Sequence, residues 1–406
     1  MNITLIAGAR PNFMKIAPII KAIKAYNEGL PVTGDGLRDA NKRIEYRLVH
    51  TGQHYDKNMS DTFFEELGIP APDVNLGCGG GSQAEQTAHI MVAFEKELLE
   101  HPTDVVLVVG DVTSTMACSI VAKKLNTKVC HVEAGIRSWD LTMPEEINRM
   151  VTDSLADYMF TTSDVANRNL MRMGATLMND GMIEAKPLND GMMPADKYAN
   201  QRVQQRVWHV GNVMIDTLLA NRSRFRKPEI WDELKLQEKE FVVMTMHRPA
   251  NVDEENHLRA MMEQIIDNVH GLPVIFPIHP RTAKLFYGLW GNEAELAKRF
   301  PNLHIVEPLG YLEFNYLVER AKAVVTDSGG ITEETTVMGV PCITLRDNTE
   351  RPETCTVGTN ELIGTNPAAI KPALDKLFAG EWKKGAIPEL WDGHAAERII
   401  DILAKL

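Results

Sequence analysis

The chain has 406 residues, of which 44% are hydrophobic and 24% charged. At roughly 150 residues per domain, this length predicts two domains or one large one, and the composition excludes a small disulfide-bonded fold and a globally disordered chain. The formal net charge of −12 disfavours nucleic acid as a partner held by whole-surface electrostatics, although a local anion site remains open.

Apolar runs of strand length alternate with helix-period segments along the whole chain, which predicts an α/β protein with parallel sheets. The first set of predicted strands lies near 2–7, 45–51, 104–109, 128–132 and 158–162. The second set lies near 207–210, 241–246, 273–278, 303–306, 323–326 and 341–345. Two doubly wound domains with a boundary near 195–210 are the simplest interpretation.

Because parallel sheets place ligands beyond the carboxyl ends of their strands, the residues after each run are the first candidates for a site. Arg10 and Lys15 follow the first run and lie at the start of a predicted helix, where two cations suit a phosphate. The alternative is an ordinary strand-to-helix turn with surface cations. Neither G-x-G-x-x-G nor a P-loop occurs here.

Two carboxylates follow the next buried runs. Asp111 comes after the strand at 104–109, and Glu133 after the strand at 128–132. If these strands are neighbours, the two acids share one crevice, where burial and like charge can separate their pKa values for acid and base work. Each acid taken alone could equally cap a helix.

A helix start is predicted at Pro144, followed by Glu145 and Glu146. Proline at the first helical position and acids in the first turn are ordinary features of a helix start, so a structural role is the default for Glu146. Glu145 is kept as a candidate for chemistry.

Two histidines come after strands of the second set, His247 and His279. Their positions invite a metal hypothesis, but neither H-E-x-x-H nor D-x-D accompanies them. Imidazoles that contact a phosphate or a reacting hydroxyl are favoured, with hydrogen-bonded loop histidines as the alternative.

The segment at 324–334 combines a strand, a turn of small residues and a helix. The backbone N–H groups of Ser328, Gly329 and Gly330 and the Ser328 hydroxyl can hold a diphosphate, because glycine allows close approach of the backbone. Glu334, one helical turn further on, can accept both hydroxyls of a ribose, and Arg351 can supply another phosphate contact.

The cysteines and the first residues of the chain indicate the cellular compartment in which the protein is expected. The five cysteines are odd in number and lack a C-x-x-C pair, which favours reduced structural thiols and argues against a cysteine zinc site. The apolar run at 3–8 is too short for a signal peptide, and no run of about 18 apolar residues occurs. We therefore expect a cytoplasmic protein without a membrane partner.

Taken together and in order, these motifs resemble the non-hydrolysing UDP-N-acetylglucosamine 2-epimerase family over most of the chain. The matching pieces are Gly8-Ala9-Arg10-Pro11, Thr51-Gly52-Gln53-His54, Gly110-Asp111, His131-Val132-Glu133-Ala134-Gly135-Ile136-Arg137, Pro144-Glu145-Glu146-Ile147-Asn148-Arg149, His209-Val210-Gly211-Asn212, His247-Arg248, Thr326-Asp327-Ser328-Gly329-Gly330 and Thr349-Glu350-Arg351-Pro352-Glu353.

The resemblance implies the glycosyltransferase-B type architecture, in which two Rossmann-like domains enclose the substrate in a cleft. The implied N-terminal domain covers residues 1–205 and is joined by a C-terminal helix at 387–406. The implied UDP-binding domain covers residues 206–386. A homodimer is the family expectation.

The resemblance also implies the reaction, in which C2 of UDP-N-acetylglucosamine is inverted to give UDP-N-acetylmannosamine without a metal or redox cofactor. UDP is eliminated to give a 2-acetamidoglucal and then adds again. This route needs acid and base groups at the sugar and retention of the departing UDP.

Carried over by matching motif, Asp111, Glu133 and Glu145 resemble the family's carboxylates around the sugar, and His247 resembles its active-site histidine. We predict proton transfer at C2 by Asp111 and Glu145, and orientation of the sugar by Glu133. The UDP-holding residues implied by the resemblance are Arg10, Lys15, His279, Phe314, Ser328, Gly329, Gly330, Glu334 and Arg351.

Other interpretations remain open at this point. The substrate could be another UDP-2-acetamido sugar, such as a diacetamido uronic acid, or the enzyme could release free N-acetylmannosamine and UDP. A glycosyltransferase and a non-catalytic UDP-sugar sensor are further alternatives. Gln53 and His54 resemble part of an allosteric substrate site, and the segments at 30–42 and 177–200 exceed the compact loops of the family.

Overall fold

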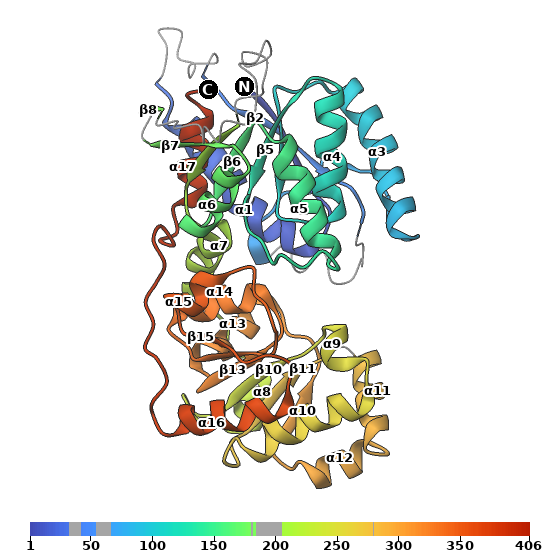
Figure 1. Ribbon diagram of the computed structural model, residues 1–406, viewed down its shortest axis with the longest axis vertical. Coiled ribbons are helices and arrows are strands. Elements are labelled where there is room, and N and C mark those ends of the chain that lie inside the picture. The colour runs from blue at the N-terminus through green and yellow to red at the C-terminus, as the bar shows by residue number, and fades with distance from the viewer. Residues whose placement is uncertain (32–41, 54–65, 180–181, 184–204, 279) are drawn as a thin grey trace. The chain divides into compact units, whose positions relative to one another are not determined.

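The computed structural model describes residues 1–31, 42–53, 66–179, 182–183, 205–278 and 280–406. The chain forms two compact units, one made of Met1–Thr217 together with Glu389–Leu406 and the other of Leu218–Pro388. Both are sheets of almost entirely parallel strands with helical connections, as Figure 1 shows, which confirms the predicted α/β class. Within the described ranges, no helix is long and apolar enough to cross a membrane.

The sheet of the first unit has nine strands in its described part, in the order β3-β2-β1-β4-β5-β6-β9-β7-β8. Their bounds in that order are Val74–Asn75, Glu45–His50, Asn2–Ala7, Val105–Val109, Lys128–Val132, Tyr158–Thr161, Arg206–His209, Thr176–Asn179 and Met182–Ile183. Among the described strands of this sheet, only β7 and β8 pair antiparallel. The order reverses between β1 and β4, which is where a doubly wound sheet leaves a crevice for a ligand.

Helices cover this sheet in two layers. Their bounds are α1 Arg10–Gly29, α3 Gln83–Glu100, α4 Thr113–Lys124, α5 Pro144–Leu155, α6 Asp164–Arg172 and α17 Ala395–Leu403. The chain passes from the first unit to the second within α7 Val213–Asn221. Helices α3, α4 and α5 pack side by side, and α17 packs against α1 (Figure 1). The handedness of the connections explains these two layers. The connection through α1 leads from β1 to β2 and the connection through α4 leads from β4 to β5, in opposite directions along the sheet. Because both crossovers are right-handed, the two helices cover opposite faces.

One strand lies elsewhere than predicted. The run near 207–210 was expected to belong to the second set, but β9 pairs parallel with β6 in the first sheet, and Tyr158 is opposite Arg206. The local pattern of a buried strand is the same in either sheet, so periodicity could not decide this pairing.

The second unit has a sheet of six parallel strands in its described part, in the order β12-β11-β10-β13-β14-β15. Their bounds are Leu303–Val306, Val274–Pro277, Val242–Thr245, Ala323–Thr326, Cys342–Thr344 and Asn360–Leu362. The order reverses between β10 and β13. The crevice of this sheet is therefore expected at the ends of these two strands.

The helices of the second unit are short and surround its sheet. Their bounds are α8 Glu229–Glu233, α9 Pro249–Val252, α10 Glu255–Asp267, α11 Pro280–Leu289, α12 Glu293–Arg299, α13 Tyr311–Arg320, α14 Gly329–Met338, α15 Pro352–Thr356 and α16 Ile370–Phe378. Two single 3-10 turns lie at Arg222–Arg224 and Pro367–Ala369.

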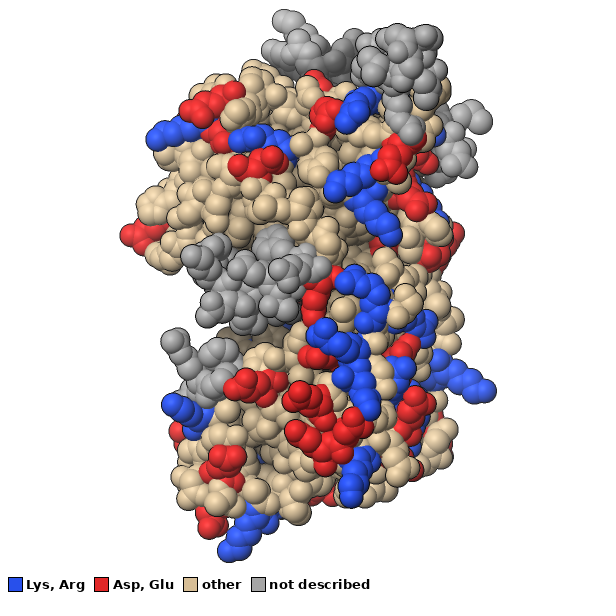
Figure 2. Space-filling view, turned by 180° about the vertical axis from the view of Figure 1, so that it is seen from behind, with Lys and Arg blue, Asp and Glu red and all other residues tan. Residues whose placement is uncertain are grey.

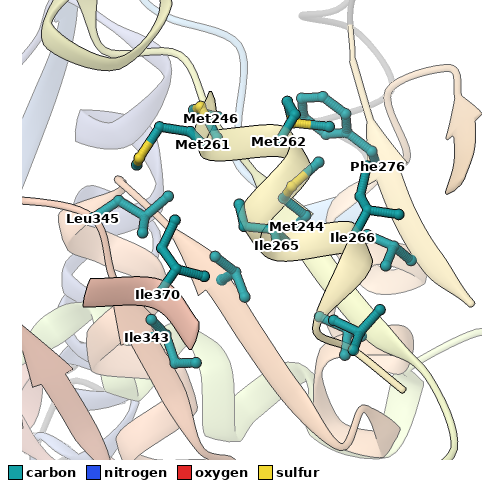
Figure 3. Packing of buried hydrophobic residues seen from close by; sticks show 14 of the residues in the cluster. Met244, Met246, Met261, Met262, Ile265, Ile266, Phe276, Ile343, Leu345 and Ile370 are labelled. Carbon is teal, nitrogen blue, oxygen red and sulfur yellow. The ribbon is translucent and has the colours of Figure 1, made fainter. Parts of the chain in front are cut away.

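Apolar packing fixes the strands whose ends carry the candidate residues. On one face of the second sheet, Met261, Met262 and Ile265 of α10 belong to one buried cluster with Met244 of β10 and Phe276 of β11 (Figure 3). Each fully buried side chain of this size stabilises the fold by about 1.5–3 kcal/mol. The ends of the strands are thereby held on a rigid support.

The charged surface is mixed. Basic and acidic side chains lie close to one another on the face that Figure 2 shows. The basic run that begins at Arg222 follows this pattern, because Arg222 pairs with Glu319 and Arg226 pairs with Glu313, with the basic side chains about half exposed. Exposed pairs of this kind contribute little to stability and give no anion site.

Candidate active site

In the first unit, a residue of α1 meets residues that follow two neighbouring strands, beside the reversal point of the sheet. Lys15 comes from α1, Asp111 follows β4 and Glu133 follows β5. Lys15 Nζ forms an ion pair with Glu133 Oε2, and both side chains are buried. The cation and the two acids predicted from separate motifs are thus brought together within one unit.

Arg149 of α5 connects the two acids. Its guanidinium pairs with Asp111 Oδ2, lies 3.4 Å from Glu133 Oε1 and also donates to the Glu133 backbone carbonyl. Arg149 is 1% exposed, whereas the Asp111 side chain is 21% exposed. Two cations therefore hold Glu133 in place, while Asp111 keeps access to a ligand.

Gly110 and the side chain of Asn12 shape the surroundings of this cluster. Gly110 has a φ of +68°, and a Cβ atom there would lie 2.9 Å from Lys15 Nζ. Asn12 bridges two strand ends, because its Oδ1 accepts from the N–H groups of Gly8 and Ala9 and its Nδ2 donates to the Val109 carbonyl. The conformation at position 110 favours glycine, and a Cβ atom there would have to displace the end of the Lys15 side chain.

Helix α5 presents polar side chains to the interior of the unit. Glu146, Asn148, Arg149, Thr152 and Asp153 are buried, while Ile147 is 46% exposed. Glu146 accepts hydrogen bonds from the N–H and hydroxyl groups of Ser138, which agrees with the structural role expected for it. Glu145 is exposed in the first turn of the same helix.

In the second unit, His247 and Asp327 face each other at the reversal point of the sheet. His247 Nδ1 lies 2.8 Å from Asp327 Oδ1. Asp327 Oδ2 accepts from the backbone N–H groups of His247 and Arg248 and from Asn251 Nδ2. Burial favours the neutral acid, but the hydrogen bond and charge of His247 and the two N–H donors outweigh it and lower the pKa of Asp327 to about 2. Asp327 thus orients the imidazole, which is mostly exposed.

The turn after β13 leads into α14 through Ser328 at its N-cap, followed by Gly329 and Gly330. The Ser328 side chain makes no capping hydrogen bond, so the first N–H groups of the helix lack that partner. Arg346, which follows β14, lies near this helix start, because a Cβ atom at Gly329 would be 3.6 Å from its NH1. A helix N-terminus with an adjacent guanidinium suits a phosphate.

Glu334 lies one turn further along α14 and is 4% exposed. Its Oε1 accepts a hydrogen bond from the Tyr311 hydroxyl at 2.9 Å. Burial raises the pKa of Glu334 to about 7, and the hydrogen bond from Tyr311 opposes this rise. Arg351 pairs with Glu333 and Glu350 and is also largely buried.

Comparison with known proteins identifies the family. A sequence model of UDP-N-acetylglucosamine 2-epimerase matches residues 38–404. The UDP-N-acetylglucosamine 2-epimerase of Methanocaldococcus jannaschii is 36% identical over 411 residues and covers 99% of both chains. The chain belongs to the UDP-N-acetylglucosamine 2-epimerase family.

A solved structure and one further relative of this family member are informative. The crystal structure of the Methanocaldococcus jannaschii 2-epimerase in complex with UDP-GlcNAc and UDP superimposes with a TM-score of 0.78 over 100% of both chains, at 36% identity. The UDP-2,3-diacetamido-2,3-dideoxy-D-glucuronate 2-epimerase of Pseudomonas aeruginosa is 34% identical over 409 residues, again over 100% of both chains. The fold is therefore that of the glycosyltransferase-B type 2-epimerases.

Some predicted residues of this epimerase family member are not in these clusters. Phe314 lies on α13, partly buried against the apolar core on the other face of the second sheet. Gln53 Oε1 accepts from the backbone N–H and the hydroxyl of Ser114 at the start of α4. His54 and His279 lie outside the described residues, as does the side chain of Arg10.

Other residues of the clusters were not predicted as site residues in this epimerase. They are Asn12, Arg149, Asn251, Tyr311, Asp327 and Arg346. Asp327 and Arg346 follow the ends of buried strands, so the rule that suggested Asp111 could have found them. In the described residues, no group of three or more His, Cys, Asp or Glu side chains is arranged to hold a metal ion.

Proposed function

We propose that this chain interconverts UDP-N-acetylglucosamine and UDP-N-acetylmannosamine by inversion at C2. The observation that carries the proposal is the Asp111–Arg149–Glu133–Lys15 cluster, in a chain that is 36% identical over its length to a 2-epimerase. In this proposal the first unit acts on the sugar, and the second unit retains UDP through the start of α14, Arg346, Arg351 and Glu334.

The proposed reaction breaks two bonds on the sugar. A base removes the C2 proton, the electron pair forms the C1–C2 double bond, and the C1–O bond breaks so that UDP leaves with its bonding electrons. Protonation of C2 from the opposite face and return of UDP to C1 complete the inversion. We assign the two proton transfers to Asp111 and Glu145, because both are accessible to a ligand.

Glu133 has a different role in this proposal. It is 2% exposed and lies between Lys15 and Arg149, which supports its assignment as a fixed acceptor that orients the sugar. His247, oriented by Asp327, is assigned to the UDP side of the reaction, where its imidazole can donate a hydrogen bond to the departing diphosphate.

The decisive experiment is proton NMR of the purified protein with UDP-N-acetylglucosamine in D2O and EDTA. We expect deuterium at C2 and a growing UDP-N-acetylmannosamine signal. Asp111→Asn and Glu145→Gln should each slow C2 exchange by about 100-fold or more, because each removes one proton-transfer group. Near-normal exchange in both variants would refute the assignment of these two acids.

A second candidate substrate is supported by the 34% identity to the Pseudomonas aeruginosa diacetamido-glucuronate 2-epimerase. The same experiment with UDP-2,3-diacetamido-2,3-dideoxy-D-glucuronate distinguishes the two sugars by their kcat/KM values. Free N-acetylmannosamine with UDP in the mixture would indicate the hydrolysing reaction instead. The predicted homodimer is tested by analytical ultracentrifugation.

A further inference from the structure

A second layer of charge lies behind the candidate catalytic acids of the first unit. His131 on β5 is fully buried, two residues before Glu133. Its Nε2 lies 2.8 Å from the backbone carbonyl oxygen of Gly110, and its Nδ1 lies 2.7 Å from Asp153 Oδ1. The motif that suggested the family contains this histidine, but no role follows from the reaction as proposed.

The partners of the ring determine where its protons are. A carbonyl oxygen can only accept, so Nε2 must carry a proton. Asp153 Oδ2 is 2.6 Å from Arg137 Nη2 and accepts the N–H of Gly135. Burial disfavours the charged form of Asp153, but its interaction with His131 and the charges of Arg137 and Arg149 outweigh burial and lower its pKa, which places it as a carboxylate. A carboxylate also only accepts, and Nδ1 must then carry a proton as well.

Other charged groups lie around the ring. Arg137 pairs with Asp153 and lies 4.0 Å from Glu146, and Arg149 pairs with Asp111 and Glu133. Buried charges are tolerated where they are paired.

We propose that His131 is a doubly protonated imidazolium that positions the two candidate catalytic strand ends. Its charge is held by Asp153, and its Nε2–H fixes the carbonyl of Gly110, the residue directly before Asp111. The N–H of Gly110 is bound in turn to the Val132 carbonyl, directly before Glu133. The His131 ring thus connects the segments that carry Asp111 and Glu133 to Asp153 of α5. The positioning role rests on the proposed function, whereas the protonation state does not.

His50 supplies a matched internal control. It is also a buried histidine at a strand end of the first unit, but its Nδ1 accepts from the N–H of Gly52. Burial lowers the pKa of His50, so this ring is neutral with one proton. The two histidines should therefore differ in their ring nitrogens under identical conditions.

Nitrogen-15 NMR of the wild-type protein, labelled on histidine, tests the protonation state at about pH 8, where exposed histidines are neutral. We expect one ring with two protonated, slowly exchanging nitrogens, absent from His131→Gln, and a His50 signal with one unprotonated nitrogen. A wild-type spectrum in which every ring has an unprotonated nitrogen would overturn the proposal. The wild-type spectrum alone can overturn the proposal, without a folded variant and without activity.

Asp153→Asn tests the positioning role. The amide can donate to Nδ1, which would leave His131 neutral with its Nε2–H still present. We expect kcat for C2 exchange to fall by about tenfold or more with little change in KM, because a neutral ring holds the Gly110 carbonyl less tightly than an imidazolium does and Asp111 can shift while substrate binding remains. A neutral ring with an unchanged kcat would refute positioning by charge. A wild-type protein inactive on both UDP-sugars would count against the proposed function alone.

Discussion

Gly110 is constrained both by its backbone conformation and by the atoms around it. Gly110→Ala should lower the free energy of unfolding by about 1–2 kcal/mol, because alanine is strained at a φ of +68°. It should also lower kcat, since the new Cβ would displace Lys15 from Glu133.

Gly339→Ala is the matched control, because Gly339 has a φ of +69° and no atom within 4 Å of the added Cβ. Denaturant unfolding and C2-exchange rates measure both effects. Equal losses of kcat in the two variants would show that strain, and not displacement of Lys15, is the cause.

The ionisation of Glu334 should appear in substrate binding. Its pKa is raised to about 7 by burial, so the carboxyl group is neutral below that pH and ionised above it. If Glu334 accepts the ribose hydroxyls, binding of UDP-N-acetylglucosamine should strengthen as the pH rises through 7. Hydrogen bonds to a charged group contribute about 1.5–3 kcal/mol, which corresponds to roughly 10- to 100-fold in Kd.

Calorimetric titration with the UDP-sugar measures this effect, and the sugar ester is used because UDP has a phosphate that titrates near pH 6. Glu334→Gln should bind with a Kd that is constant over the same pH range. An unchanged pH dependence in this variant would assign the titration to another group.

Among the elements, α17 depends on a carboxylate from a distant part of the chain. Asp216 of α7 accepts the N–H groups of Ala395 and Ala396 at the first turn of α17. Burial raises the pKa of Asp216 to about 6, although these two hydrogen bonds oppose the rise. The helix that packs on α1 is therefore held by a group that titrates under mild conditions.

Asp216→Asn should change how stability depends on pH. The folded pKa lies above the ordinary value, so the contribution of this group is fully present below about pH 4 and is lost as the pH rises through about 6. The unfolding free energy of the wild type minus that of the variant should fall by roughly 2 kcal/mol between pH 4 and pH 7. Urea unfolding at several pH values measures it. Asp375→Asn, an exposed member of an i,i+4 pair, should show no such trend.

For the whole molecule, the proposal predicts which segments exchange hydrogen more slowly when UDP alone binds. UDP at 100 times its Kd should stabilise the folded chain by about 2.7 kcal/mol. Hydrogen exchange should slow most in the second unit, at Ser328–Glu334 and around Arg346 and Arg351. Protection confined to the first unit would contradict the assignment of the UDP site. N-acetylglucosamine at the same concentration is the control.

The sequence by itself determined the α/β class and most strands, because the continuous apolar runs and the residues that follow them are local features. It also identified Lys15, Asp111, His247 and Ser328 as candidate site residues, because each comes at or soon after a strand end. It could not decide that β9 joins the first sheet, because a buried strand carries the same pattern in any sheet. Nor could it show that Arg149 joins Asp111 to Glu133, or that His131 faces Asp153 and Gly110. Those contacts join segments far apart in the chain, so strand order and the inward-facing polar side of α5 decided them.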